Sequence, residues 1–436
     1  MSATLISVEG AKVKIELTIE LSESMLDSEG KIQEGLNEAG CIAAREAMKH
    51  LDTDGSAIKL GEKTWRTKGQ EEKAYQTPYG EVVVARHVYQ SAGGGKTYCP
   101  MERNARIVVT STPMFAKQIS SKIANGVARE VQRDLRENHG REVAVSYIQR
   151  LSEAVGSIVQ AKEEGENYEP PEIAVKIESV GIGLDGTCML MCEDGWREAM
   201  VGTISLYDCE GERQHTIYLG ATPEYGRKRF LERFEREITQ TKDRYPNATY
   251  VGIADGAESN WKFLNEHTEE QILDFYHASG YLGILAEILH PKQIPEQKEW
   301  LKNSCHQLKH EFGSAKKFYN QMVLAMTENK LTETMREKLQ ASITYFKNHL
   351  WQMDYAQFQQ KTYPIGSGVT EAACKTLIKQ RLCCSGMCWK EKGASIILSL
   401  RALVLTSTLG SNSGTISTSM GCLLLPNNCI ILRSHP

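Results

Sequence analysis

Three acidic residues, Asp185, Asp255 and Glu371, stand where the sequence pattern could bring carboxylates together. Phosphoryl transfer with two metal ions needs several carboxylates around divalent cations roughly 4 Å apart. Mg²⁺ is a hard cation that prefers oxygen ligands, so carboxylates are the appropriate residue type. The first question is therefore which elements could bring these three side chains to one place.

Asp185 follows the apolar run Val175–Leu184 and lies in the motif GLDGT. We predict a strand over this run, with the aspartate directly after it and beside a glycine that lets a ligand approach closely. An ordinary turn is the alternative, because Asp-Gly is a common hairpin turn. The motif alone leaves both interpretations open.

Asp255 and Glu371 each have a functional and a structural interpretation. Asp255 ends Thr249–Ala254, a run apolar enough for a buried strand. Ligands of open α/β sheets bind at the carboxyl ends of such strands, but an aspartate here could also cap a helix near Ser259. Glu371 lies in PIGSGVTEAACK, near the start of a helix predicted from Thr370. A helix N-terminus favours an anionic ligand, although a glutamate in the first turn could only complement the helix dipole.

The elements around these residues are predicted to alternate between strands and helices. In chain order they are strands at Val175–Leu184, Ala199–Tyr207 and Gln214–Leu219, a helix at Glu224–Tyr245, a strand at Thr249–Ala254, a helix at Ser259–Glu266 and a strand at Gln271–Tyr276. A long helical stretch, Ser279 to about Tyr355, precedes the last helix. This is the order of a ribonuclease-H-like domain, an α/β sheet with helices on both faces.

The first part of the chain is predicted to be an α+β region. It has a strand at Ala11–Glu20, a helix at Lys31–Leu51 and a hairpin around Thr77-Pro78-Tyr79-Gly80. Helices at Met114–Glu137 and Glu142–Ala161, joined by Asn138-His139-Gly140, favour a helix-turn-helix. An acidic linker ending in two prolines, Glu163–Pro171, indicates a domain boundary. The predicted regions are 1–110, 111–165, 172–278 (the sheet), 279–360 (the helical insertion), 361–409 (the last helices) and an irregular tail, 410–436.

Basic and polar side chains in two places are candidate DNA contacts. The helix from Glu142 is the natural recognition helix, and the helix after Glu371 could follow a DNA backbone. A solvated basic face that binds nothing is the alternative in both places. The first set is Lys117, Lys122, Arg129, Arg133, Arg141, Ser146, Tyr147, Gln149 and Arg150, and the second is Lys375, Lys379 and Arg381.

Composition bounds the function classes. The 436 residues carry a net charge of only -4, so a DNA-binding surface must come from local clustering. Met1–Gly10 has no signal-peptide pattern, and no run approaches the ~20 apolar residues of a membrane span. We therefore expect a cytoplasmic protein with no membrane partner, whose 12 cysteines stay reduced. Cys383, Cys384 and Cys388 have no second cysteine or histidine pair at zinc spacing, so we predict no structural zinc, and Cys188 and Cys192 are predicted to be inert core thiols.

Four motifs in this order, GLDGT, IADGAESNW, DFYHA and PIGSGVTEAACK, resemble the transposases of the Kra group of bacterial insertion sequences, which are relatives of the Mutator-like DDE transposases. The resemblance extends from about Tyr79 to Leu405. It implies a ribonuclease-H-like catalytic domain with an all-helical insertion, preceded by a helix-turn-helix region. It also implies that Asp185, Asp255 and Glu371 hold two Mg²⁺ (or Mn²⁺) ions.

The same resemblance implies a catalytic position for His277, which stands in a D-x-x-H motif with Asp274. A core histidine is the alternative. The expected function is metal-dependent DNA cleavage and strand transfer. The implied partners are double-stranded DNA, as terminal inverted repeats and as target, and a second copy of the chain in a synaptic complex. Such a protein would associate with the nucleoid when bound. Two alternatives are a DNA-binding protein that has lost catalysis and a ribonuclease-H-like nuclease that does not join strands.

Overall fold

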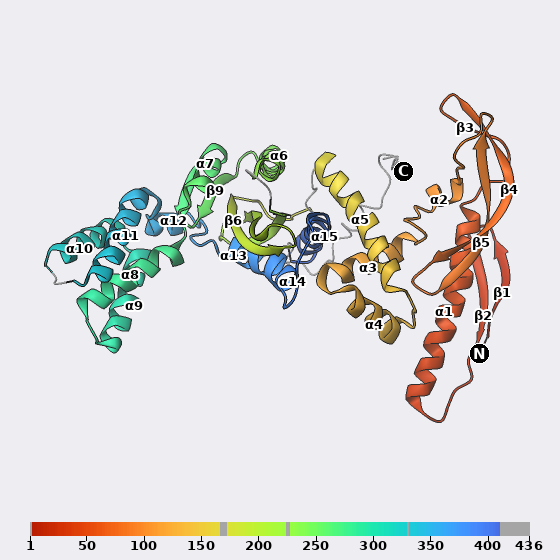
Figure 1. The fold of residues 1–436 in the computed structure, drawn as a ribbon, viewed down its shortest axis with the longest axis horizontal. Coiled ribbons are helices and arrows are strands. Elements are labelled where there is room, and N and C mark those ends of the chain that lie inside the picture. Colours follow the sequence, from red (N-terminus) through yellow and green to blue (C-terminus); the bar gives the residue numbers. More distant parts are fainter. Residues whose placement is uncertain (1, 166–171, 224–226, 329–330, 410–436) are drawn as a thin grey trace. The chain divides into compact units, whose positions relative to one another are not determined.

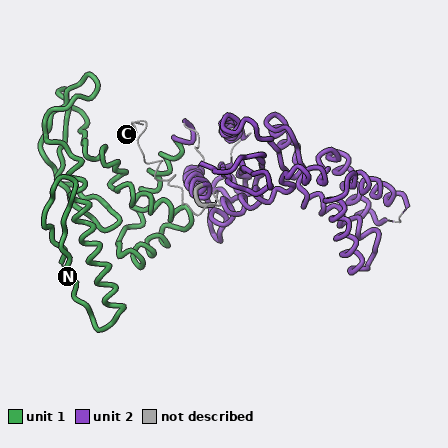
Figure 2. Tube along the Cα trace, turned by 180° about the vertical axis from the view of Figure 1, so that it is seen from behind, with its two compact units in different colours: residues 1–161, 418–436 green, residues 162–417 purple. Residues whose placement is uncertain are grey.

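The computed structural model describes residues 2–165, 172–223, 227–328 and 331–409. The predicted irregular tail, residues 410–436, and residues 166–171 of the predicted linker lie outside the described residues. The chain divides into two compact units between Ala161 and Lys162 (Figure 2), and each is described by itself. Within the described part of the chain, no helix combines the length and the apolar character that crossing a bilayer requires.

Unit 1 begins with two antiparallel sheets and a long helix (Figure 1). The elements are β1 (Ser2–Glu9), β2 (Lys12–Thr18), α1 (Met25–His50), β3 (Ile58–Leu60), β4 (Lys63–Gln76) and β5 (Glu81–Ser91). The predicted strand, helix and hairpin are confirmed, and β1 is an additional strand that pairs with β2. The β4–β5 turn closes where Thr77 donates its backbone N–H to the Gly80 carbonyl at 2.9 Å.

The helices of unit 1 differ from the prediction in one place. They are α2 (Pro100–Asn104), α3 (Pro113–Asn125), α4 (Ala128–His139) and α5 (Val145–Gly165). The single helix predicted from Met114 is wrong, because Gly126 adopts extended backbone and Glu130 accepts a hydrogen bond from the Val127 N–H, which starts a new helix. Gly140, at φ +60°, ends α4 where the sequence predicted a break. The region predicted to form a helix-turn-helix therefore contains three helices, α3, α4 and α5, instead of two.

A five-stranded mixed sheet forms the centre of unit 2, with strand order β10-β9-β6-β7-β8. The strands are β6 (Ser179–Met191), β7 (Gly195–Tyr207), β8 (Arg213–Ala221), β9 (Thr249–Ala254) and β10 (Glu270–Leu273). The first three are antiparallel neighbours, and β9 and β10 run parallel to β6. The predicted meander and the chain order are confirmed, and the fold of this unit is mixed α/β.

Two strand ends lie elsewhere than predicted. β6 continues past Leu184 to Met191, because residues 185–191 pair with the start of β7. Asp185 therefore lies within a strand, opposite Val201, and the hairpin-turn interpretation of its Asp-Gly pair is wrong. β10 ends at Leu273, so Tyr276 belongs to the first turn of the next helix and not to the strand.

Helices cover both faces of this sheet. The first face carries α6 (Lys228–Arg244) and α7 (Glu258–His267), and the second carries α13 (Gly368–Ala373), a π-helical turn η3 (Cys374–Lys379), α14 (Gln380–Leu382) and α15 (Glu391–Leu409). Gly202 on β7 leaves room for α6 to pack on the sheet, because a Cβ there would lie 2.9 Å from the ring of Phe234 in α6. Phe234 is fully buried, and burying such a ring contributes roughly 1.5–3 kcal/mol.

The segment between β10 and α13 is entirely helical, as predicted. Its helices are α8 (Phe275–Leu289), α9 (Ile294–His310), α10 (Ser314–Glu328), α11 (Glu333–His349), the 3₁₀ turn η2 (Leu350–Gln352) and α12 (Tyr355–Gln360). Buried residues of this insertion, including Phe318 and Phe346, belong to the same hydrophobic core as the sheet. Tyr355 donates its hydroxyl to the Leu273 carbonyl at 3.0 Å, which ties the insertion to the end of β10.

Candidate active site

Strand register brings Asp185 and Asp255 to neighbouring positions. β6 and β9 are parallel, and their last registered pair is Gly183 with Ile253. Asp185 lies two residues beyond that pair, within β6. Asp255 also lies two residues beyond it, directly after β9. Because side chains two residues apart in a strand share a face, both carboxylates leave the sheet on one side. Asp255 directly follows β9, as predicted.

Close contact between a helix and a strand brings Glu371 to the same side of the sheet. Thr370 of α13 lies over Gly183, where an added Cβ would stand 1.9 Å from the Thr370 Oγ1. The Thr370 hydroxyl also forms a 2.7 Å hydrogen bond with Thr203 of β7. Only glycine at position 183 permits this approach, so the glycine before Asp185 serves helix packing. Glu371, the next residue along α13, lines the same cavity as Asp185.

The Asp185 carboxylate is half-buried, and each of its oxygens accepts one hydrogen bond. Its Oδ1 accepts the Gly186 N–H at 2.7 Å, and its Oδ2 accepts a hydrogen bond from the Cys374 thiol at 3.3 Å. Burial raises the pKa of Asp185, and the negative charges of Asp255 and Glu371 raise it further. The three carboxylates are thus electrostatic neighbours, and a cation among them would relieve both the repulsion and the desolvation.

The loop after β9 is shaped around the second aspartate. The Asp255 Oδ1 accepts the Ala257 N–H at 3.1 Å, and its backbone carbonyl accepts the Tyr345 hydroxyl of α11 at 2.7 Å. Gly256 has φ +105°, a conformation that favours glycine. The Tyr345 ring lies 3.0 Å from the place where a Cβ at Gly256 would stand. An insertion helix therefore fixes the backbone of a candidate metal ligand.

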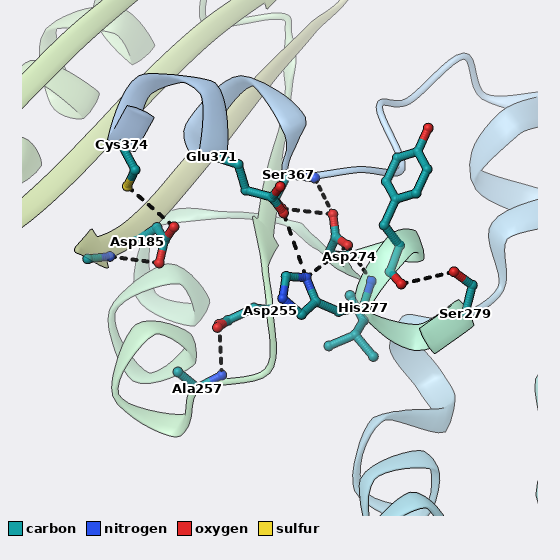
Figure 3. Close-up of polar contacts among 12 residues, drawn as sticks. Asp185, Asp255, Ala257, Asp274, His277, Ser279, Ser367, Glu371 and Cys374 are labelled. Atoms are coloured by element: carbon teal, nitrogen blue, oxygen red, sulfur yellow. Dashed lines mark hydrogen bonds and ion pairs between the residues drawn. The ribbon is translucent and has the colours of Figure 1, made fainter. Parts of the chain in front are cut away.

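Asp274 joins the remaining site residues into one network (Figure 3). This fully buried carboxylate accepts hydrogen bonds from the Ser367 N–H at 2.5 Å, the Ser367 hydroxyl at 2.8 Å and the His277 N–H at 2.7 Å. Burial would raise the pKa of Asp274, but the bonds from Ser367 and His277 outweigh it and hold the pKa below its ordinary value. Asp274 is therefore a charged helix cap of α8 and an anchor for the loop before α13.

Ser367 and His277 extend this network to Glu371. The Ser367 hydroxyl lies 2.7 Å from the Glu371 Oε1, and the His277 Nδ1 lies 3.7 Å from the same oxygen. Asp274, His277 and Glu371 each offer a ligand atom within 4.8 Å of the others. The His277 and Glu371 side chains are 49% and 48% exposed, so both can reach a ligand in solvent. The interpretation of His277 as a core histidine is wrong for this reason.

A cavity of about 700 Å³ opens beside these groups. Its lining includes Asp185, His277, Glu371, Lys375 and Lys379. Asp255 lies outside that lining, yet its charge acts on Asp185. The cavity thus places carboxylates, which attract cations, beside two exposed lysines, which attract anions.

Not all of the predicted DNA contacts are accessible. Arg141 is buried, donating to the Thr77 carbonyl at 3.2 Å and to the Gln76 Oε1 at 2.7 Å, so its assignment as a DNA contact is wrong. Arg381 is buried too, 5.4 Å over the Trp389 ring, and its assignment is wrong for the same reason.

The other candidate DNA contacts in unit 1 differ in how exposed their side chains are. Tyr147 is half-buried, with its hydroxyl 3.2 Å from that of Thr110, and Lys122 forms a 2.5 Å ion pair with Asp134. Lys117 is half-buried. The exposed members are Arg129, Arg133, Ser146, Gln149 and Arg150. A DNA surface on these helices would therefore depend mainly on arginines of α4 and on the exposed first turns of α5.

No protein-family model matches this chain, and a search of curated proteins finds no match either.

Sequence reasoning identified the carboxylates but missed the residues that hold them. Ser367 and Tyr345 carry no motif of their own, since a serine in a glycine loop and a tyrosine in a helix are ordinary. Asp274 was named through the D-x-x-H motif, and an aspartate directly before a helix is also a common N-cap that accepts the N–H of the third helical residue. The observed cap is of this kind.

Proposed function

We propose that this chain is a DDE-type transposase that cleaves DNA at the ends of its insertion sequence and joins them to a target. We also propose that unit 2 is a ribonuclease-H-like domain interrupted by a helical insertion. Three antiparallel strands followed by two parallel ones, with helices on both faces, support it. The motifs GLDGT, IADGAESNW, DFYHA and PIGSGVTEAACK are the sequence support.

One observation carries the catalytic part. Asp185, Asp255 and Glu371 come from a strand, a strand end and a helix far apart in sequence, and the charges of the other two raise the pKa of Asp185. Carboxylates that raise one another's pKa repel each other, and a bound cation would relieve that repulsion. Phosphoryl transfer with two divalent ions requires carboxylates of this kind around the ions.

These residues fit two Mg²⁺ or Mn²⁺ ions, because the donor set is oxygen-rich and anionic. Asp185, Asp255 and Glu371 would hold the ions. When bound, the ions supply Lewis acidity that activates the attacking water or 3′-hydroxyl and stabilises the leaving oxygen. The protein's own groups do the rest: Ser367 orients Glu371, and Lys375 and Lys379 attract the phosphate backbone.

Unit 1 would provide the DNA-end recognition. Exposed polar and basic side chains on α4 and α5, such as Arg133 and Arg150, are of the types that contact phosphates and bases. Two ends must be held together for strand transfer, so we propose that a second copy of the chain joins in the synaptic complex.

The decisive experiment uses the full chain and a duplex carrying the DNA that flanks its coding sequence. With Mg²⁺ or Mn²⁺, we expect strand cleavage at an inverted repeat and, with a target duplex, a joined product. Asp255→Asn should bind the duplex but not cut it. Cleavage without joining would replace the proposal by a nuclease, binding without cleavage under both metals would indicate lost catalysis, and cleavage by Asp255→Asn would refute the assigned triad.

A further inference from the structure

Two exposed cysteines from distant parts of unit 2 lie side by side, outside the candidate active site. The sulfur atoms of Cys192 and Cys388 are 3.2 Å apart, although 196 positions separate them in sequence. Both are free thiols and both are exposed. The prediction that Cys192 is an inert core thiol is therefore wrong, and Cys188, which is also exposed, departs from it in the same way.

Backbone pairing holds the two cysteines at this distance. Cys192 follows β6 and donates its N–H to the Trp389 carbonyl at 2.8 Å. Trp389 in turn donates its N–H to the Leu190 carbonyl at 3.1 Å, so the segment before α15 runs beside the end of β6 like a short added strand. The Trp389 indole also donates to the Leu382 carbonyl at 2.8 Å, which anchors this segment to α14. The thiols therefore meet without rearrangement of the main chain.

A soft-metal site is the competing explanation for clustered thiols. Cys383 contributes to this neighbourhood, with its sulfur 3.6 Å from the Cys188 carbonyl oxygen. Among the described residues, however, the group of three or more metal-ligating side chains that converges within 4.8 Å is Asp274, His277 and Glu371, and it contains no cysteine. A zinc site needs about four converging ligands. The thiols of Cys383 and Cys384 donate to backbone carbonyl oxygens, whereas those of Cys192 and Cys388 contact each other, which favours a bond between these two.

We propose that Cys192 and Cys388 form a reversible disulfide when the protein meets a small-molecule disulfide such as oxidised glutathione. The thiolate of one cysteine attacks a glutathione sulfur, forms a mixed disulfide and releases one glutathione thiolate. The second cysteine, as its thiolate, attacks the protein sulfur of that mixed disulfide and releases the other. The two protein thiols lose two electrons and two protons, and oxidised glutathione gains the electrons to become two molecules of the thiol.

Such a bond would join the strand that carries Asp185 to the chain that follows the Glu371 helix. β6 contains both Asp185 and the residues up to Met191, and Cys388 lies between α14 and α15. The crosslink closes a very long loop, which restricts the unfolded chain more than a short loop would. Oxidation therefore should raise the thermal stability of unit 2, whether or not the protein cuts DNA.

The test compares the reduced full chain with the same chain after incubation with oxidised glutathione. Peptide mapping without reductant should recover Cys192 linked to Cys388, and both should resist alkylation. The unfolding midpoint should rise by roughly 5 °C or more and return after dithiothreitol. Cys192→Ser and Cys388→Ser should each abolish both the linked peptide and the rise, and the double variant should show no further change.

Cys209→Ser is the matched control, because Cys209 is exposed in the turn between β7 and β8 and should leave the midpoint rise intact. Three results would overturn the proposal. The first is that Cys192 and Cys388 both remain open to alkylation after oxidation. The second is a stable glutathione adduct on one of these two cysteines with no disulfide between them. The third is a disulfide from one of them to Cys188, Cys383 or Cys384. Because the mapping reads covalent structure, none of these outcomes depends on DNA cleavage.

Discussion

The hydroxyl of Tyr345, in helix α11 of the insertion, donates a 2.7 Å hydrogen bond to the backbone carbonyl of Asp255, at the end of strand β9. The ring also packs against Gly256, whose φ of +105° turns the chain away from the strand. An insertion far along the sequence thus holds the backbone from which a candidate metal ligand projects. Its contribution should appear in the reaction rate more than in folding.

Tyr345→Phe should lower metal-dependent cleavage about fivefold, because losing one hydrogen bond costs about 1 kcal/mol and loosens the Asp255 loop. The packing of the ring is kept, so the unfolding midpoint should change little. Cleavage rates at saturating metal measure the effect. Tyr319→Phe, in α10 of the same insertion, is the control, and an equal loss of rate in both variants would show that the bond to Asp255 has no special role.

Ser367→Ala should reduce cleavage roughly 10–100-fold while leaving DNA affinity unchanged. The serine hydroxyl links Asp274 to Glu371, at 2.8 and 2.7 Å, and its loss frees Glu371 and deprives a buried carboxylate of a donor. Ser367→Thr retains the hydroxyl and should recover part of the rate. Ser279→Ala, which removes a hydroxyl bonded to the Tyr276 carbonyl, should be close to wild type. Parallel assays of DNA binding and of cleavage distinguish a loss of Glu371 orientation from a loss of DNA affinity. Weaker DNA binding by Ser367→Ala would contradict a role of Ser367 in orienting Glu371.

Mg²⁺ or Mn²⁺ should raise the unfolding midpoint of the wild-type chain by several degrees, and a chelator should reverse the rise. Binding only to the folded state stabilises it by about 2.7 kcal/mol at 100 times the dissociation constant. Glu371→Gln and Asp255→Asn should remove most of this response. Asp185→Asn should raise the midpoint without metal, because it removes a partly buried charge that two neighbouring carboxylates repel. A metal response that persists in all three variants would place the ions elsewhere.

Arg141→Ala and Arg150→Ala should behave differently, although both arginines lie near the start of α5 in sequence. Arg141 is buried and bonded to the hairpin turn, so its loss should cost about 1–3 kcal/mol of stability. Arg150 is exposed, so its loss should weaken DNA binding and reduce the salt dependence of the binding constant, with little effect on folding. Chemical denaturation and binding at several salt concentrations measure the two effects. Equal effects of both variants on DNA affinity alone would contradict this assignment.

Much of the fold follows from local patterns in the chain. Alternating and continuous apolar runs predicted β2, β7, β8 and β9, and the stretch from Ser279 to about Tyr355 was predicted to be helical. Such patterns depend on neighbours within one turn or one strand, so they can be recognised without knowledge of the tertiary contacts. They could not place the end of β6, because pairing with β7 extends that strand beyond its apolar run.

The sequence by itself determined that Asp185, Asp255 and Glu371 are the carboxylates to consider, through their positions after apolar runs and through motif order. Only the tertiary structure decided what surrounds them. The contact of Thr370 with Gly183, the bond from Tyr345 to Asp255 and the Asp274–Ser367–Glu371 network each join residues that are distant in the chain. The burial of Arg141 and Arg381 could not be predicted either, because a basic residue has the same local sequence pattern whether its guanidinium faces solvent or packs inside the fold.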